Sequence, residues 1–266
     1  MRFIVKLILI IALLQVIIIY SISLYEKLNA GEKLNFLSVL KVMLYEYFAS
    51  VYIFFSWVFG FIPFEEWYPG RGKYKIPVFI IPGYFLTRTV ILPLFLRFKR
   101  GGFENVYLLV LRPFSSSIKD LSEKLSVKVK QTLEMLGYER CIIVGHSVGG
   151  LVARYFIEKM GGDKITLKCI TLGTPHKGTK TSVLLFGKNT KDMLPSSKLI
   201  EELNQQKKGN YFCILSKLDA SIIPKDSAII TTSDYFEADS LGHFGMLFSE
   251  KVFLKIIEHI KNEKIF

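Results

Sequence analysis

The chain has 266 residues, 50% of them hydrophobic, and a formal net charge of +12. A mean hydropathy of +0.34 is too high for an ordinary soluble domain, so part of the chain is expected to meet lipid. The 35 Lys and Arg residues are scattered and form no stripe typical of nucleic-acid-binding modules, which excludes nucleic acid as the expected partner. A solvated basic surface or an attraction to anionic lipid headgroups remains.

The first predicted element is an apolar helix over residues 3–25. Residues 7–25 contain no charged side chain and are mainly Ile, Leu and Val. As a helix they reach about 28 Å, close to the hydrocarbon thickness of a bilayer. A cleavable signal peptide is the alternative, but its apolar core normally spans about 7–15 residues and ends at a small-x-small site, which this sequence lacks. We therefore expect an uncleaved anchor.

A second apolar helix is predicted over residues 42–64, a block interrupted only by Glu46 and ending near Pro63. Its many Tyr, Phe and Trp residues suit a membrane interface. The alternative is a buried or in-plane helix packed on the rest of the chain. If both segments span, they form a hairpin in the cell membrane.

The side of the membrane follows from the basic residues that flank the two segments. Five of them lie outside the hairpin and three lie between its arms: Arg2, Lys6, Arg71, Lys73 and Lys75 against Lys27, Lys33 and Lys41. This count favours a cytoplasmic location for the rest of the chain, whereas a single span would put it outside. We expect a membrane-anchor region over 1–67, a linker over 68–75 and one domain over 76–266.

The domain is predicted to alternate strands and helices. A helix over 118–136 begins with a capping box of Ser117 and Asp120 and stops at Gly137. A closing helix covers 249–264. Strands are expected at 76–81, 106–111, 141–144, 168–172, 211–215 and 228–231. This order builds a mainly parallel sheet flanked by helices, with reactive groups at the carboxyl ends of the strands.

Three cysteines lie inside these apolar strand-like runs. Cys141, Cys169 and Cys213 are therefore predicted to be buried free thiols, and a disulfide framework is not expected.

The most informative motif is Gly145-His146-Ser147-Val148-Gly149, set directly behind an apolar run. It predicts a nucleophile elbow, in which a sharp strand-to-helix turn lifts a serine hydroxyl clear of the sheet. The glycines are needed because a side chain at either position would press on the neighbouring strand or helix. A glycine-rich turn with no chemistry is the alternative. We expect Ser147 to be a nucleophile.

A serine nucleophile needs a base, and the chain has four histidines. His243 is the candidate because it lies on a glycine-flanked loop after the last predicted strand, in the chain order serine, acid, histidine. His146, beside the serine, is expected to point elsewhere and to be structural. His176 and His259 are the remaining two.

The acid that orients the imidazole is expected to be Asp219, which follows the predicted strand at 211–215. Asp226 is the second choice. The oxyanion needs preorganised donors. The backbone N–H of Val148 is one, and the backbone N–H of Tyr84 is the other, with Gly83 permitting a close approach.

Four motifs occur in order: Pro82-Gly83-Tyr84, the run from Gly145 to Arg154, the run from Thr171 to Thr179, and the run from Gly242 to Leu247. Together they resemble the bacterial triacylglycerol lipase/esterase family of α/β-hydrolases, in forms with an apolar N-terminal extension. The resemblance covers residue 76 to the C-terminus and implies an α/β-hydrolase fold. It also implies a Ser147–Asp219–His243 triad, ester hydrolysis without a cofactor or metal, and Asp219 rather than Asp226 as the acid. One departure is Pro82-Gly83, where many members have His-Gly.

The function expected is that of a membrane-anchored serine esterase or lipase, which hydrolyses lipidic carboxylic esters through an acyl-enzyme on Ser147. Its partners are the membrane and a lipid or other hydrophobic ester. An acyltransferase or thioesterase would use the same triad, and a catalytically retired interaction module is a further alternative. Residues 178–195 are either a mobile cap or a packed connection. The apolar residues of 85–96 either line an acyl pocket or pack in the core.

Overall fold

The computed structural model describes residues 2–61, 72–205, 207–231 and 233–262. Half of the predicted linker (68–71 of 68–75), the end of the second apolar block and the last residues of the predicted closing helix therefore lie outside the described residues. Within the described part, the cysteines Cys141, Cys169 and Cys213 are buried free thiols, as predicted.

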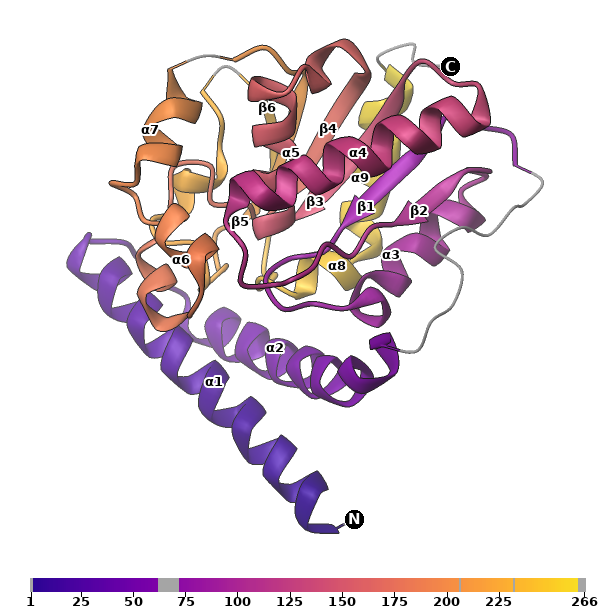
Figure 1. Cartoon of the computed structure of the whole chain (residues 1–266). Helices are drawn as coiled ribbons and strands as arrows, with labels where there is room; N and C mark the ends of the chain where they lie inside the picture. Colours follow the sequence, from indigo (N-terminus) through magenta and orange to yellow (C-terminus); the bar gives the residue numbers. More distant parts are fainter. Residues whose placement is uncertain (1, 62–71, 206, 232, 263–266) are drawn as a thin grey trace.

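A sheet of six parallel strands forms the centre of the domain, in the order β2-β1-β3-β4-β5-β6 (Figure 1). The strands are β1 (Val78–Ile81), β2 (Val106–Leu108), β3 (Cys141–His146), β4 (Thr166–Leu172), β5 (Tyr211–Ser216) and β6 (Asp234–Ala238). Every pairing between neighbours is parallel. The mainly parallel sheet inferred from the alternation of strands and helices is confirmed.

Helices cover both faces of this sheet. The helices of the domain are α3 (Arg88–Arg100), α4 (Ile118–Leu136), α5 (Val148–Lys159), α6 (Lys188–Asp192), α7 (Lys198–Asn204), α8 (Gly245–Phe248) and α9 (Glu250–Asn262). Side chains alternate along each strand, so Val78 and Ile80 pack with α3 and α9, whereas Phe79 and Ile81 pack with α4 and α5. The sheet is thus buried on both faces.

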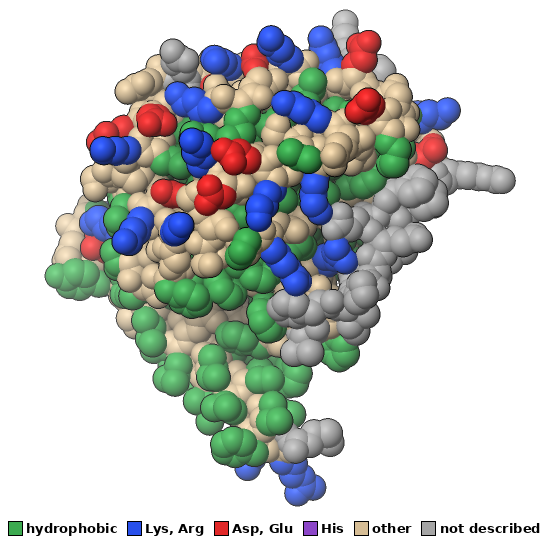
Figure 2. All heavy atoms as spheres, in the orientation of Figure 1, with side chains coloured by type: hydrophobic (Ala, Val, Ile, Leu, Met, Phe, Trp, Pro, Cys, Tyr) green, Lys and Arg blue, Asp and Glu red, His purple; other side chains and the backbone are tan. Residues whose placement is uncertain are grey.

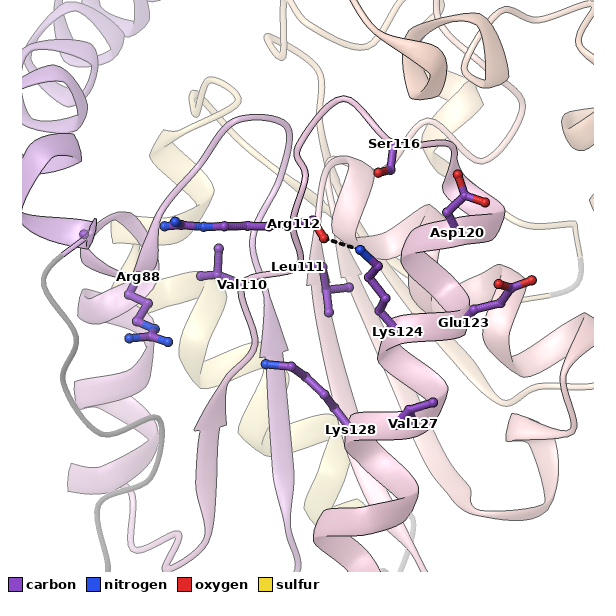
Figure 3. Close-up of a pocket in the computed structure, with 11 residues that line it drawn as sticks. Arg88, Val110, Leu111, Arg112, Ser116, Asp120, Glu123, Lys124, Val127 and Lys128 are labelled. Carbon is purple, nitrogen blue, oxygen red and sulfur yellow. Dashed lines mark hydrogen bonds between the residues drawn. The ribbon is translucent and has the colours of Figure 1, made fainter.

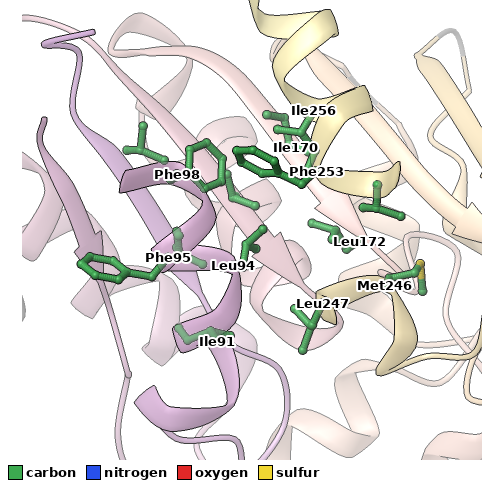
Figure 4. Packing of buried hydrophobic residues seen from close by; sticks show 14 of the residues in the cluster. Ile91, Leu94, Phe95, Phe98, Ile170, Leu172, Met246, Leu247, Phe253 and Ile256 are labelled. Carbon is green, nitrogen blue, oxygen red and sulfur yellow. The ribbon is translucent and has the colours of Figure 1, made fainter. Parts of the chain in front are cut away.

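The layer between the sheet and helices α3 and α9 is closely packed (Figure 4). Phe98 of α3 meets Phe253 of α9 edge to face, with ring centroids 5.3 Å apart. Ile91, Leu94 and Phe95 are buried in the same cluster, so for them the core-packing alternative holds. Each fully buried side chain of this size contributes about 1.5–3 kcal/mol to stability.

The predicted capping residues of α4 act as expected. The Ser117 hydroxyl accepts a hydrogen bond from the Asp120 N–H at 3.1 Å, and Gly137 ends the helix at φ 70°. The strand predicted at 228–231 is wrong. Residues of that stretch follow a short turn of 3-10 helix (Lys225–Ala228), and the last strand is β6. The apolar run was misleading because it fills a small cluster beneath the loop, while β6 is an edge strand with exposed side chains.

Two long apolar helices precede the domain. They are α1 (Arg2–Asn29) and α2 (Phe36–Trp57), followed by a 3-10 turn at Val58–Phe61. The second helix begins and ends earlier than the predicted 42–64. It lies between α1 and the domain and contacts α3 and α8 (Figure 1). The N-terminal part of α1 projects away from the domain, and its exposed side chains are mostly apolar, with the basic Arg2 and Lys6 near its start (Figure 2).

Candidate active site

Ser147 sits at a sharp turn between β3 and α5. Its backbone has φ 53° and ψ −124°, a conformation that side-chain-bearing residues rarely adopt. A Cβ on Gly145 would lie 2.5 Å from the Cα of Gly150, and a Cβ on Gly149 would lie 2.5 Å from the Ile81 carbonyl oxygen. Both glycines are therefore required by close approach, as the motif indicated.

The structure brings Asp219 and His243 together. Asp219 follows β5 and His243 follows β6, and His243 Nδ1 lies 2.9 Å from Asp219 Oδ2. The other carboxylate oxygen of Asp219 accepts the N–H groups of Ser221 and Ile222 at 2.8 and 3.3 Å. Asp226 lies on the later 3-10 turn. Of the two candidate acids, Asp219 is the one that contacts the imidazole.

This contact sets the tautomer and the basicity of His243. A carboxylate only accepts hydrogen bonds, so Nδ1–H is the donor and Nε2 is left free to accept a proton. Burial lowers the pKa of His243, but the charge and hydrogen bond of Asp219, together with the charge of Glu46, raise it above the ordinary value. The ring is therefore a stronger base than an isolated imidazole.

Ser147 and His243 line the same cavity, which has a volume of about 580 Å³. The wall opposite the serine comes from the N-terminal helices: Gln15 and Ile19 of α1, and Ser50, Ile53, Phe54 and Trp57 of α2. The remaining lining is largely apolar and includes Phe85, Leu184, Leu185 and Met193. The site is thus enclosed between the domain and the helices that precede it.

The two predicted oxyanion donors flank the serine. Val148 begins α5, where the first N–H groups have no partner within the helix. Tyr84 lies in the loop after β1, and a Cβ on Gly83 would be 2.9 Å from the Cβ of Ser147. Tyr84 and Val148 both line the cavity. The next residue, Phe85, has φ 54°, so this loop holds a constrained backbone close to the serine.

Residues 178–195 consist of a packed part, here called the base, which is hydrogen-bonded to the rest of the domain, and an exposed apolar part, Val183–Phe186, here called the crest. The base is fixed by backbone hydrogen bonds, from Thr179 N–H to the Met193 carbonyl and from Lys188 N–H to the Ser115 carbonyl, both 2.8 Å. The Tyr84 hydroxyl donates to the Phe186 carbonyl at 2.6 Å. Val183, Leu184, Leu185 and Phe186 are exposed. The base is thus a packed connection, one of the two alternatives considered for this segment. Leu184 and Leu185 of the crest line the cavity that contains Ser147.

Comparisons with known proteins agree with this architecture. Residues 116–220 match the family described as "PGAP1-like alpha/beta domain". The structure resembles the mature lipase BlEst2 of Bacillus licheniformis, with 15% identity, a TM-score of 0.64, and coverage of 74% of this chain and 95% of that one. The domain has an α/β-hydrolase fold.

Two further structures resemble this domain. Lipase B of Aspergillus fumigatus has 17% identity and a TM-score of 0.60, with coverage of 70% of this chain and 52% of that one. An esterase from Thermogutta terrifontis has 14% identity and a TM-score of 0.54, with coverage of 71% and 90%. No curated protein matches in sequence. At such low identity the likeness establishes the fold, and the catalytic roles of Ser147, Asp219 and His243 stay predictions.

The other three histidines have different surroundings. His146 does not point away from the site as expected: its Nε2 lies 3.1 Å from the His243 carbonyl, and the two rings are 4.7 Å apart. Burial, and then the charge of His243, lower the pKa of His146 well below its ordinary value, so this ring is neutral. His176 Nε2 contacts the Thr171 hydroxyl at 2.9 Å, and His259 stacks on Phe212.

A second cavity of about 880 Å³ lies beside α4 (Figure 3). Side chains of both charges line it, among them Arg88, Arg112, Asp120, Glu123 and Lys124. The Lys124 ammonium donates to the Arg112 carbonyl at 2.6 Å. Ser147 and His243 are not among its lining residues, so this larger cavity is separate from the candidate active site.

Sequence reasoning missed the contribution of α1 and α2 to the active site. Both segments were interpreted from their apolar composition, which indicates contact with lipid but not with a domain. One signal was available: Glu46 is the single charged residue in the block 42–64. A carboxylate in such a block needs partners for its oxygens, and the structure places them next to His243.

Proposed function

We propose that the chain is a membrane-anchored serine esterase or lipase that hydrolyses lipidic carboxylic esters through an acyl-enzyme on Ser147. The observation that carries this proposal is an apolar cavity lined by both Ser147 and the Asp219-paired His243. A serine on a constrained elbow, a base of raised pKa and nearby N–H donors are together the parts that acyl transfer requires.

The reaction follows from these positions. Ser147 Oγ attacks the ester carbonyl while His243 Nε2 takes the hydroxyl proton, and Asp219 stabilises the imidazolium. The N–H groups of Tyr84 and Val148 stabilise the oxyanion. His243 then gives its proton to the departing alcohol, which leaves an acyl ester on Ser147. A water molecule, deprotonated by His243, attacks that ester; His243 then returns this proton to Ser147 Oγ as the acyl–oxygen bond breaks, which releases the carboxylic acid and restores the free serine.

A hydrophobic substrate fits the walls of the cavity. The lining from α1 and α2 is largely apolar, and the exposed crest at Val183–Phe186 adds apolar surface at the same end of the domain. A cavity of about 580 Å³ falls within the roughly 300–1,000 Å³ that small-molecule sites usually provide. An acyl chain would therefore lie against the N-terminal helices while its carbonyl meets Ser147.

The anchor in this proposal is α1, with α2 docked on the domain. The exposed residues along α1 are mostly Ile and Leu, among them Ile4, Ile10, Leu14 and Ile18. By contrast, the C-terminal half of α2 is hydrogen-bonded to the domain: the Tyr52 hydroxyl donates to the Thr89 carbonyl at 2.8 Å, and Glu46 and Trp57 make further contacts. The C-terminal end of α1 also reaches the domain, through an ion pair of Glu26 with Lys180. These contacts favour the in-plane alternative for α2.

Reporter fusions test this arrangement. With α2 docked, a reporter inserted after Lys33 and one at the C-terminus lie on the same side of the membrane. A membrane-spanning hairpin would put them on opposite sides. Accessibility of the two reporters to a membrane-impermeant reagent in intact cells distinguishes the outcomes.

The activity is tested with the detergent-solubilised full chain and p-nitrophenyl esters of increasing acyl length. We expect hydrolysis that is abolished in Ser147→Ala and that favours longer chains over acetate. Added alcohol or amine acceptors that divert the acyl group at the expense of hydrolysis would indicate an acyltransferase. A folded wild-type protein that turns over none of these esters or their thioesters would contradict the proposal and favour the retired interaction module.

A further inference from the structure

A buried carboxylate from α2 lies against the loop that carries His243. The side chain of Glu46 belongs to a residue only 4% exposed. Its Oε2 accepts the N–H of Phe244 at 3.1 Å, and its Oε1 accepts the N–H of Gly245 at 2.7 Å. Both oxygens are thus occupied by the two residues that follow His243. Nearly 200 positions of sequence separate the carboxylate from the loop that it holds.

The glycines beside His243 make room for this carboxylate. A Cβ on Gly242 would lie 2.2 Å from the Cγ of Glu46, and a Cβ on Gly245 would lie 3.3 Å from its Oε1. The first position admits no side chain while Glu46 is in place. The glycine-flanked loop is therefore shaped to receive a side chain from the N-terminal helix.

The Glu46 carboxylate and the loop that carries His243 depend on each other for their hydrogen-bond partners. A buried carboxylate is costly unless its oxygens accept hydrogen bonds, and buried N–H groups are costly unless they find an acceptor. Docking of α2 and ordering of the loop at His243 are therefore coupled. The charge of Glu46 also acts on the His243 ring, in the same direction as that of Asp219.

The other loops of the site are held by the same helices. The Tyr20 hydroxyl of α1 donates to the carbonyl of Leu218 at 3.2 Å, immediately before Asp219. The Trp57 indole N–H of α2 donates to the carbonyl of Phe85 at 2.8 Å, immediately after Tyr84. Each loop that carries a predicted catalytic group, apart from the elbow itself, thus has a polar contact with α1 or α2.

We propose that Glu46 is a positioning residue for His243, and that α1 and α2 are through such contacts a working part of the active site as well as its attachment to lipid. The expected changes in rate rest on the proposed function, whereas the expected effect of Glu46 on the position and titration of His243 does not. Glu46 is not among the residues that line the cavity with Ser147. Through the His243 loop, Glu46 fixes the position and orientation of the imidazole relative to Ser147.

The test compares Glu46→Gln with Tyr52→Phe in the full chain. Gln keeps the size of the side chain but replaces one acceptor oxygen with an NH₂ group facing a backbone N–H. Tyr52→Phe removes the hydrogen bond of α2 to Thr89 while leaving the His243 loop untouched, so it reports on α2 docking alone. Rates are measured with p-nitrophenyl butyrate across pH, and melting temperatures show that both variants are folded.

We expect kcat to fall about 10- to 100-fold in Glu46→Gln with KM nearly unchanged, because misplacing a catalytic group by about 1 Å costs this much. The acid limb of kcat should also move to lower pH. The groups facing His243 are Asp219, Glu46 and the neutral His146. Burial raises the pKa of Glu46 to about 7, so its negative charge acts on the imidazole most fully above that pH, and removing this charge lowers the imidazole pKa. Tyr52→Phe should leave both the rate and the limb unchanged.

A second readout does not require turnover. In protein with 15N-labelled histidine rings, the His243 resonances, assigned with His243→Asn, report its titration directly by NMR. We expect the pKa of His243 to fall in Glu46→Gln and to stay fixed in Tyr52→Phe. An unchanged titration, or an equal change in both variants, would overturn the role of Glu46. If the wild type hydrolyses nothing, the proposed function fails, and the titration still decides the role of Glu46.

Discussion

The α/β domain and the two N-terminal helices follow different physical rules. The domain is held by apolar side chains that alternate along parallel strands, so its architecture is readable from short stretches of sequence. The helices are largely apolar and pack on the domain through side chains such as Ile53, but the positions at which they meet the loops of the site are set by a small number of polar contacts from Tyr20, Glu46, Tyr52 and Trp57. In an apolar segment, the rare polar side chains therefore indicate where it docks.

The largest effect on activity is expected from a substitution within the domain. Asp219→Asn should lower kcat/KM by about 10⁴-fold, because the amide no longer stabilises the imidazolium or fixes its tautomer. Asp226→Asn is the matched control and should retain nearly full activity. Steady-state kinetics of the two variants with one ester check this, and the reverse pattern would transfer the acid role to Asp226.

A smaller effect is expected where the two regions meet. Gly242→Ala should lower kcat about 10- to 100-fold, because the new Cβ lies within 2.2 Å of Glu46 Cγ. In a Glu46→Ala background the same change should cost much less, since the clash is gone. A double-mutant cycle measures this coupling. Additive losses would show that Gly242 and Glu46 act independently.

The pH dependence of wild-type activity tests whether a carboxylate from the domain and one from α2 together raise the pKa of His243. His243 acts as a base only when neutral, and both Asp219 and Glu46 raise its pKa. Activity should therefore fall as pH decreases through a value above the 6.5 of an ordinary imidazole, losing about tenfold for each pH unit below it. An acid limb below 6.5 in a kcat/KM profile would mean that burial outweighs the two carboxylates.

The smallest effect is expected on the helix side. Tyr20→Phe removes one hydrogen bond, from α1 to the carbonyl that precedes Asp219. A typical loss of about 0.5–1.5 kcal/mol corresponds to roughly a 2- to 10-fold change. We expect a decrease in kcat within this range and a small fall in melting temperature. A loss as large as that of Asp219→Asn would mean that Tyr20 does more than hold the loop.

Local patterns in the sequence were enough to predict much of the domain. The elbow at Ser147 and the caps of α4 are encoded by adjacent residues, and the parallel sheet by the alternation of strands and helices. The edge strand β6 was missed because Asp234–Ala238 has no apolar run, and the neighbouring buried stretch at 228–231 mimicked a strand. Chain order selected His243, and the position directly after a predicted strand selected Asp219 over Asp226; the structure brings Asp219 and His243 into contact.

The architecture of the site as a whole was less predictable. The contacts of Glu46, Tyr20 and Trp57 join residues far apart in sequence, and no local pattern reports them. His146 was expected to point elsewhere because its neighbours on the elbow showed only the turn, not the His243 loop that packs on it. Composition identified α1 and α2 as apolar helices but did not reveal that their side chains line the cavity that contains Ser147.

The most direct test of the account is reaction of the detergent-solubilised full chain with a fluorophosphonate probe, followed by mass spectrometry to locate the adduct. Such probes report a serine activated by a base and an oxyanion site, whatever the natural substrate. The account predicts labelling of Ser147, none in Ser147→Ala, and slower labelling in Glu46→Gln than in Tyr52→Phe. Folded wild-type protein that remains unlabelled would contradict an active serine hydrolase.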